Sequence, residues 1–407
     1  MPRGQRAAAP GNAYLTDQLI PYIGNKRKLL GLIGQAIEMT GLPGGTFLDL
    51  FAGSGVVGRF AKLSGFRVIA NDWEPYARTI NSAYISTNRT PPFERFGGAE
   101  AFCEHLNALP GMRGYIARHY CPADDEAPDT RTERMFFTQA NGRRLDAIRE
   151  ELCSLREDGA ISQCEHDLFV AALIFGTSWC SNTSGVFKGF HRGWGGATQT
   201  AWYRIREPLQ IRVPRLYDNG QDNLTLQEDA ALLAPRLDCD IAYLDPPYNQ
   251  HQYGANYHLL NTVALWDKPG IPESISPQRG DKAAIRRDWR EERRSAFCVR
   301  AQAAGEMERL ACNLRARWIL VSYSTDGLIP AEELVRTLHR AGRLSWVHRP
   351  YKRYRVSSQR PSPRSHTIEF VLVVETAAAP DTRSRDRVLR ALASAASAAP
   401  RPVSMKE

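Results

Sequence analysis

The feature that most restricts the fold of this chain is a strand, a glycine-rich turn and a helix start in direct succession. Residues 46–50 (Thr-Phe-Leu-Asp-Leu) predict a strand, and glycines follow at positions 53, 55 and 58. This is the G-x-G-x-x-G spacing, in which missing side chains let the backbone approach a ligand closely. Residues 66–70 predict the next strand. The order of strand, turn, helix and strand predicts a parallel α/β sheet.

An acidic residue, Asp72, directly follows the second predicted strand. A carboxylate at this position can accept hydrogen bonds from both hydroxyl groups of a ribose. Alternatively, Asp72 caps the helix that begins near Pro75. A ribose-bearing cofactor is therefore the prediction, and the pattern alone does not choose between NAD and S-adenosylmethionine.

A rigid corner, Asp245-Pro246-Pro247-Tyr248, follows the apolar residues 241–244. Proline fixes φ and cannot donate a ladder hydrogen bond, so the predicted strand ends here, where open α/β sheets place ligand sites. The carboxylate can accept hydrogen bonds from an exocyclic amine, and the aromatic ring can stack on a flat heterocycle. This pairing suits chemistry on a base taken out of its duplex. The alternative is a plain turn that ends the strand.

Two further candidates lie at predicted helix starts. The loop 22–26 leads into a helix, so its backbone N–H groups and Lys26 can hold a carboxylate, although a solvated lysine is the alternative. Asp229 precedes a short helix that starts at Ala230. It can reach the adenine amino group of a cofactor or cap that helix, and both readings stay open.

Residues 91–225 interrupt the strand–helix rhythm and predict a mostly helical insertion for target recognition. The loop 181–196 mixes glycine, amide, hydroxyl, aromatic and basic groups, which are typical of contacts to bases and phosphates, although it can also be a packed surface loop. Residues 341–360 hold six Arg or Lys and no acid among aromatic residues, which favours a nucleic-acid edge. The residues expected to contact DNA are Asn182, Ser184, Lys188, Arg192, Lys352 and Arg353.

Composition narrows the function classes. The formal net charge of +9 favours a polyanionic partner. The eight cysteines include no Cys-x-x-Cys pair, so neither a zinc site nor a disulfide framework is expected, and no metal is expected. No apolar run reaches membrane-spanning length, and no signal peptide is recognised, so a soluble cytoplasmic protein without membrane contact is expected.

The expected organisation has five parts. They are a disordered leader (1–12), the cofactor-binding part of the catalytic domain (13–90), the insertion (91–225), the acceptor-site part (226–376) and a disordered tail (377–407). Within the acceptor-site part, residues 271–312 form a charged helical segment, interpreted as a solvated face.

Over roughly residues 14–376 these motifs together resemble the D12 class of adenine-specific DNA methyltransferases, typified by the Dam methylases. The resemblance implies a Rossmann-like methyltransferase sheet, S-adenosylmethionine as cofactor, and the N6 amino group of adenine in double-stranded DNA as acceptor. It implies cofactor binding by Tyr22, Lys26, Asp49, Phe51, Gly53, Gly55, Asp72 and Asp229, and a reaction at Asp245, Pro246, Pro247 and Tyr248.

In the implied mechanism, Asp245 and the carbonyl of Pro246 accept hydrogen bonds from N6, and Tyr248 stacks on the flipped base. The nitrogen then attacks the methyl group in line, without a covalent enzyme intermediate. N4-cytosine methylation and RNA adenine methylation are alternatives within the class, and a NAD-dependent oxidoreductase or a catalytically idle DNA-binding module are alternatives outside it. A cognate restriction endonuclease encoded nearby is a candidate partner.

Overall fold

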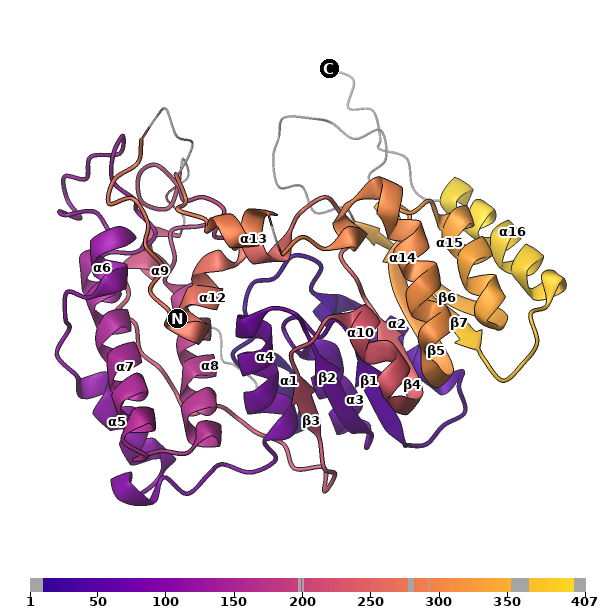
Figure 1. Ribbon diagram of the computed structural model, residues 1–407, viewed down its shortest axis with the longest axis horizontal. Coiled ribbons are helices and arrows are strands. Elements are labelled where there is room, and N and C mark those ends of the chain that lie inside the picture. The colour runs from indigo at the N-terminus through magenta and orange to yellow at the C-terminus, as the bar shows by residue number, and fades with distance from the viewer. Residues whose placement is uncertain are drawn as a thin grey trace, which may run out of the picture.

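The computed structural model describes residues 10–196, 199, 201–276, 282–291, 293–352 and 366–398. Its centre is one seven-stranded sheet of order β3-β2-β1-β4-β5-β7-β6 (Figure 1). The strands are β1 (Thr46–Asp49), β2 (Arg67–Asn71), β3 (Leu224–Leu226), β4 (Asp238–Leu244), β5 (Arg315–Ser324), β6 (Arg343–Lys352) and β7 (His366–Glu375). This sheet with its flanking helices confirms the α/β Rossmann-like prediction.

Strand direction places the ligand crevice. Strands β1 to β5 run parallel, whereas β7 lies antiparallel between β5 and β6. From β1 the chain continues outward to β2 and β3, and from β4 it continues the other way to β5. The order therefore reverses between β1 and β4, and open α/β sheets bind ligands outside the carboxyl ends of strands at such a point.

Helices cover both faces of the sheet because the inner strands, such as β4 and β7, bury apolar residues on both sides. One face packs against α2 (Leu30–Glu38) and α3 (Val56–Leu63). The other face packs against α10 (Ala230–Leu233), α14 (Arg300–Asn313), α15 (Ala331–Leu338) and α16 (Thr382–Ala398).

The helical part expected from residues 91–225 lies beside the sheet, at the left of Figure 1. Its helices are α5 (Ala99–Ala108), α6 (Tyr115–His119), α7 (Gln139–Glu157), α8 (Gln163–Trp179) and α9 (Trp202–Arg206). Of these, α5 to α8 share one hydrophobic core with α4 (Pro75–Asn81) and α12 (His258–Leu265), which belong to the sheet-bearing part. The two parts are thus packed together rather than joined only by linkers.

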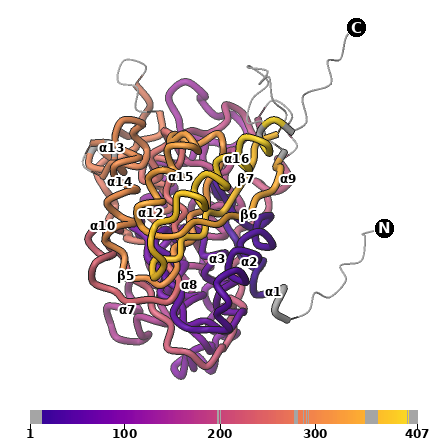
Figure 2. Tube along the Cα trace, turned by 90° about the vertical axis from the view of Figure 1, so that its right-hand side faces the viewer, coloured from indigo at the N-terminus to yellow at the C-terminus, as the bar shows by residue number. Residues whose placement is uncertain are grey.

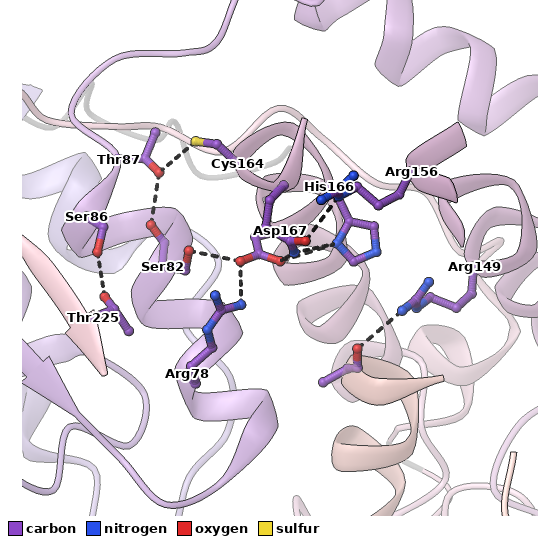
Figure 3. A network of polar contacts seen from close by, with 12 residues as sticks. Arg78, Ser82, Ser86, Thr87, Arg149, Arg156, Cys164, His166, Asp167 and Thr225 are labelled. Carbon is purple, nitrogen blue, oxygen red and sulfur yellow. Dashed lines mark hydrogen bonds and ion pairs between the residues drawn. The ribbon is translucent and has the colours of Figure 1, made fainter. Parts of the chain in front are cut away.

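A polar network joins α8 to α4 at this junction (Figure 3). The guanidinium of Arg78 lies 2.5 Å from the carboxylate of Asp167, which also accepts a hydrogen bond from Ser82. Gln163 donates to the other oxygen of Asp167 at 2.7 Å. Asp167 is buried, so these partners compensate its charge and fix the angle between the two helices.

The expectation that the tail from residue 377 is disordered is wrong for its described part, because α16 (Thr382–Ala398) lies there. Val388 and Leu392 lie one helical turn apart and are buried in the core beneath the sheet. Ser384 Oγ also accepts a hydrogen bond from the backbone N–H of Leu344 on β6. Figure 2 shows α16 beside α15 and β6. At the other end, α1 (Pro10–Thr16) begins inside the expected leader, whose residues 1–9 lie outside the described ones.

The interpretation of residues 271–312 as a solvated helical face is also wrong in part. This segment contains α13 (Arg287–Glu291), a 3₁₀ turn at Ala296–Cys298 and then α14. Trp289 and Phe297 are buried, and residues 293–297 line the crevice described below. The dense charge of the segment hides these apolar anchors. No described helix has the length and apolar character that a membrane span requires.

Candidate active site

A cavity of about 300 Å³ opens at the carboxyl ends of β1 and β4, a size at the lower end for small-molecule sites. Loops from distant parts of the chain form its walls. They are residues 22–26, 49–54, 71–74, 228–231, 245–248, 252–254 and 293–297. The cavity therefore brings the glycine-rich turn, the acid after β2 and the proline corner together.

The glycine-rich turn has the backbone that its sequence predicts. Gly53 and Gly55 have φ values of 50° and 76°, in the left-handed region that favours glycine, and α3 begins at Val56. A Cβ on Gly53 would lie 2.8 Å from Cε1 of Tyr22, and one on Gly55 would lie 2.7 Å from Oδ1 of Asn81. Glycine is needed at both positions, and Tyr22 packs directly on the turn.

Asp72 lies in the wall of the cavity and is tied to the turn. One carboxylate oxygen accepts a hydrogen bond from the N–H of Gly53 at 2.7 Å, and the other accepts from the N–H of Glu74 at 2.9 Å. The N-cap residue of α4 is Glu74, so the alternative of Asp72 as helix cap is wrong. Burial raises the pKa of Asp72 to about 6, against the two backbone hydrogen bonds and the charge of Arg293, which lower it.

Asp49, at the end of β1, is almost fully buried at 1% exposure. Neither of its carboxylate oxygens meets a donor in hydrogen-bonding geometry among the described residues. Burial raises its pKa well above the usual value, as do the charges of Asp245 and Asp72, while the nearby backbone N–H groups of Phe51 and Gly58 oppose that rise. A buried carboxylate with so little compensation costs free energy, and a cationic ligand group in the cavity would compensate it.

Asp229 also lines the cavity, together with Phe51. Its Oδ1 accepts hydrogen bonds from Ala231 and Leu232 at 2.8 and 3.4 Å, so the interpretation of Asp229 as the cap of α10 is confirmed. The ring of Phe51 meets that of Phe297 edge to face, with centroids 5.4 Å apart. These two rings form an apolar wall.

The proline corner holds a buried ion pair. Lys26 Nζ lies 3.0 Å from Oδ1 of Asp245, and the two side chains are 3% and 16% exposed. The alternative of a solvated Lys26 is therefore wrong. The carboxylate that Lys26 holds here is that of Asp245 in the same chain. Burial disfavours the ammonium, but the charge of Asp245 together with Tyr248, Tyr243 and Glu369 outweighs it and raises the pKa of Lys26 well above its usual value. Burial raises the pKa of Asp245, and Lys26 opposes that rise.

Tyr248 is held from several sides. Its carbonyl accepts a hydrogen bond from the N–H of Leu328 at 3.0 Å, and its ring meets the edge of Tyr323 at 5.4 Å. Lys26 Nζ lies 3.4 Å from the hydroxyl of Tyr248 and 4.8 Å from its ring centroid. Pro246 is buried and Pro247 half-buried. The corner is thus rigid, and both Asp245 and Tyr248 line the cavity.

Glu74, Tyr253 and Arg293 are among the cavity-lining residues that sequence reasoning did not single out. Tyr253 donates from its hydroxyl to the carbonyl of Ile23 at 3.0 Å and so supports the loop that carries Tyr22. Its position in the aromatic stretch directly after the corner was a usable signal. Arg293 stands in a run of arginines, and nothing in the sequence distinguishes it from the other arginines of that run.

The expectation that Asn182 contacts DNA is wrong. Its side chain is fully buried and donates to the carbonyls of Met135 and His191, at 2.9 and 3.0 Å. Its Oδ1 accepts a hydrogen bond from Gly195. Asn182 therefore holds the recognition loop (residues 182–196) in shape, which satisfies its amide as burial requires.

Other members of the recognition loop are exposed, namely Ser184, Lys188 and Arg192. The loop is anchored beside the cavity, because Phe187 donates from its N–H to the carbonyl of Asn256 at 2.7 Å. The contact of these three side chains with DNA remains a prediction.

The remaining expected DNA contacts lie at the edge of the sheet. Lys352 is the last residue of the edge strand β6, and Arg353 lies outside the described residues. The described residues contain no group of three or more His, Cys, Asp or Glu side chains arranged to hold a metal ion.

The chain was compared with known proteins. Residues 22–288 match the family model for D12 class N6 adenine-specific DNA methyltransferases. The chain is 30% identical over 360 residues to the Type II methyltransferase M.NlaIII of Neisseria lactamica, covering 87% of this chain and 98% of that protein. No solved structure matches at a significant level.

Two other relatives are longer than this chain. It is 30% identical over 323 residues to the modification methylase LlaI of Lactococcus lactis subsp. lactis, covering 77% of this chain and 47% of that protein. It is 29% identical over 372 residues to the Type II methyltransferase M.FokI of Planomicrobium okeanokoites, covering 90% of this chain and 54% of that protein. The chain thus spans about half the length of these two relatives.

Proposed function

Because the chain belongs to the D12 class of N6 adenine-specific DNA methyltransferases, we propose that the cavity above β1 and β4 is its active site. Site-specific methylation of adenine in DNA is the activity of this family. The oxidoreductase and N4-cytosine alternatives are not favoured by these matches. Which residues of this chain bind the cofactor and the base is our proposal, argued from the geometry.

The cofactor proposed for the deep part of the cavity is S-adenosylmethionine, which methyltransferases of this family use. When bound, it supplies an electrophilic methyl group. The unpartnered, buried carboxylate of Asp49 fits the ammonium of its methionine part, and the oxygens of Asp72 can each accept a further hydrogen bond from a ribose hydroxyl. The close approach of Gly53 to Tyr22 supports a backbone shaped to lie along such a ligand.

The acceptor amine is proposed to lie at Asp245. The lone pair on N6 of adenine is delocalised into the ring, so the free amine is a poor nucleophile. An ionised Asp245 and the carbonyl of Pro246 would accept hydrogen bonds from N6 and concentrate electron density on the nitrogen. Lys26, at 3.0 Å from Asp245, favours the ionised carboxylate inside a buried site.

The flipped base is proposed to stack on Tyr248, whose position is held by Leu328 and Tyr323. Base flipping exposes the amine that is inaccessible within a duplex. The exposed Lys188 and Arg192 are proposed to contact phosphates, which position the duplex without reading its sequence. Type II modification methylases act on DNA within restriction–modification systems, and we propose a cognate restriction endonuclease as the functional partner.

The observation that carries this proposal is the Lys26–Asp245 pair, which faces the same cavity as Asp72 and the glycine-rich turn. We expect Asp245→Ala to abolish tritiated-methyl transfer to duplex DNA while calorimetry finds S-adenosylmethionine binding largely retained. Asp238→Ala is the matched control, because Asp238 is exposed at the opposite end of β4. Nucleoside analysis of the methylated DNA should find N6-methyladenine. Robust transfer by Asp245→Ala would refute the assignment of the acceptor corner.

A further inference from the structure

Residues 293–298 form a strap across one side of the cavity. At one end, the N–H of Ser295 donates to the side-chain oxygen of Gln252 at 2.8 Å, and the side-chain nitrogen of Gln252 donates to the carbonyl of Ser295 at 3.3 Å. Cys298 donates to the carbonyl of His251 at 3.3 Å, and Phe297 packs on Phe51. The strap is thus tied to the segment that follows the proline corner.

At its other end the strap reaches Trp73 through Arg293. The guanidinium donates to the carbonyl of Trp73 at 2.5 Å and lies 5.1 Å from the centroid of its ring. The backbone N–H of Arg293 is itself fixed by the carbonyl of Asp288 at 3.0 Å. A planar guanidinium that both stacks and donates is held in one place. That place adjoins Asp72, the residue directly before Trp73.

The charges that line the cavity distinguish Arg293 from the other basic side chains there. Among the described residues that line the cavity, the basic side chains are Lys26, Arg293 and Arg294. Lys26 is paired with Asp245, and Arg294 is exposed. Arg293 is half-buried and is the basic group whose charge acts on both Asp72 and Glu74.

We propose that Arg293 is a positioning residue of the cofactor site, which supplies the positive charge that the buried Asp72 carboxylate needs to hold the ribose hydroxyls. This inference rests on the proposed role of Asp72 in cofactor binding. Arg293 acts through Asp72 and Trp73 by its charge, so a lysine at this position should serve and an uncharged side chain should not.

The electrostatics of the site support this role. Burial raises the pKa of Asp72 to about 6 and that of Glu74 to about 7, and the charge of Arg293 lowers both. The charge of Asp72 in turn raises the pKa of the other titratable groups around it, namely Glu74 beside it, Asp49 at the end of β1, and the hydroxyls of Tyr22 and Tyr76. Among the surrounding side chains, Arg293 exerts the main charge effect on Asp72 itself, and it lowers the pKa. Without Arg293, a larger fraction of Asp72 would therefore be protonated near neutral pH.

The test compares Arg293→Gln and Arg293→Lys in the full chain. Glutamine can still donate to the Trp73 carbonyl but carries no charge, whereas lysine keeps the charge. The dissociation constant of S-adenosylmethionine is measured by calorimetry from pH 5.5 to pH 8.5, with circular dichroism as the check on folding. Asp72→Asn serves as the reference, because its binding should be weak and nearly independent of pH.

We expect wild-type affinity to fall as the pH drops through about 6, the pKa of Asp72. In Arg293→Gln this fall should move upward by roughly one pH unit, which makes binding about fivefold weaker at pH 6 and leaves it near wild type at pH 8.5. Arg293→Lys should follow the wild-type profile.

Equal weakening of Arg293→Gln at every pH, or no weakening at all, would overturn the positioning role while leaving the proposed function intact. A wild-type protein that binds no S-adenosylmethionine, or an Asp72→Asn variant that binds it normally, would instead overturn the proposed cofactor site on which the inference rests.

Discussion

Replacing Lys26 by methionine separates two roles that sequence and structure assign to this residue. The family resemblance groups Lys26 with the cofactor ligands, whereas its ammonium lies 3.0 Å from the carboxylate of Asp245. At an effective dielectric constant of about 20, two unit charges at this distance attract by about 5 kcal/mol, before any desolvation penalty. Removing one partner of a buried pair costs about 3–5 kcal/mol. This corresponds to a rise of roughly 2–4 units in the pKa of Asp245.

We therefore expect Lys26→Met to lower kcat at neutral pH because Asp245 becomes protonated and no longer offers N6 an ionised hydrogen-bond acceptor beside the carbonyl of Pro246. Below the shifted pKa, kcat should fall about tenfold per pH unit and recover in alkaline buffer. A carboxyl whose folded-state pKa is raised loses its contribution to stability as the pH rises through that value. The melting temperature of the variant should accordingly fall toward alkaline pH as its activity recovers.

The assay is single-turnover methylation of a duplex substrate across pH, with S-adenosylmethionine affinity measured separately by calorimetry. Lys28→Met is the matched control, since Lys28 is exposed two residues away and should leave both quantities unchanged. If Lys26→Met weakened S-adenosylmethionine binding tenfold or more and left kcat and its pH profile unchanged, Lys26 would be a cofactor ligand. The reasoning from the ion pair would then be refuted.

Three further predictions concern the base, the DNA and the fold. Tyr248→Ala should lower kcat/KM about ten- to hundredfold through lost stacking, whereas Tyr248→Phe should keep much of it. If Tyr248→Phe lowered kcat/KM as much as Tyr248→Ala, the hydroxyl of Tyr248 rather than its ring would be the group that acts on the base. Lys188→Ala and Arg192→Ala should each reduce the slope of log affinity against log salt by about 0.9, measured by fluorescence anisotropy, and an unchanged slope would exclude a phosphate contact. Burial raises the pKa of Glu74 to about 7, so stability is lost as the pH rises through that value. Between pH 5 and 7, Glu74 should lower the free energy of unfolding of the wild type by up to about 1.4 kcal/mol per pH unit, and Glu74→Gln should remove this decrease in urea unfolding. An equal decrease in the wild type and in Glu74→Gln would contradict the prediction.

The sequence alone determined the local elements around the site. Glycine at positions 53 and 55 tolerates the left-handed backbone of the turn, and two prolines end β4 wherever the strand lies. These restrictions act on the residue itself, so they hold before any tertiary contact is known. The order of the motifs along the chain also sufficed to indicate the family. The glycine-rich turn, Asp72 and the proline corner each follow a strand, and parallel strands share one edge.

Only the tertiary structure decided what each polar side chain faces. The hydrophilic character of Asn182 suggested contact with DNA, but its amide donates to the carbonyls of Met135, outside the loop, and His191, within it. Lys26 and Arg293 stand in basic runs that are usually solvated, yet one is paired with Asp245 and the other lies over Trp73. The alanine-rich tail likewise becomes a helix because Val388 and Leu392 find a core to cover. A side chain's partner is set by residues far away in the sequence, and that information appears only when the strands and loops that carry them are brought together.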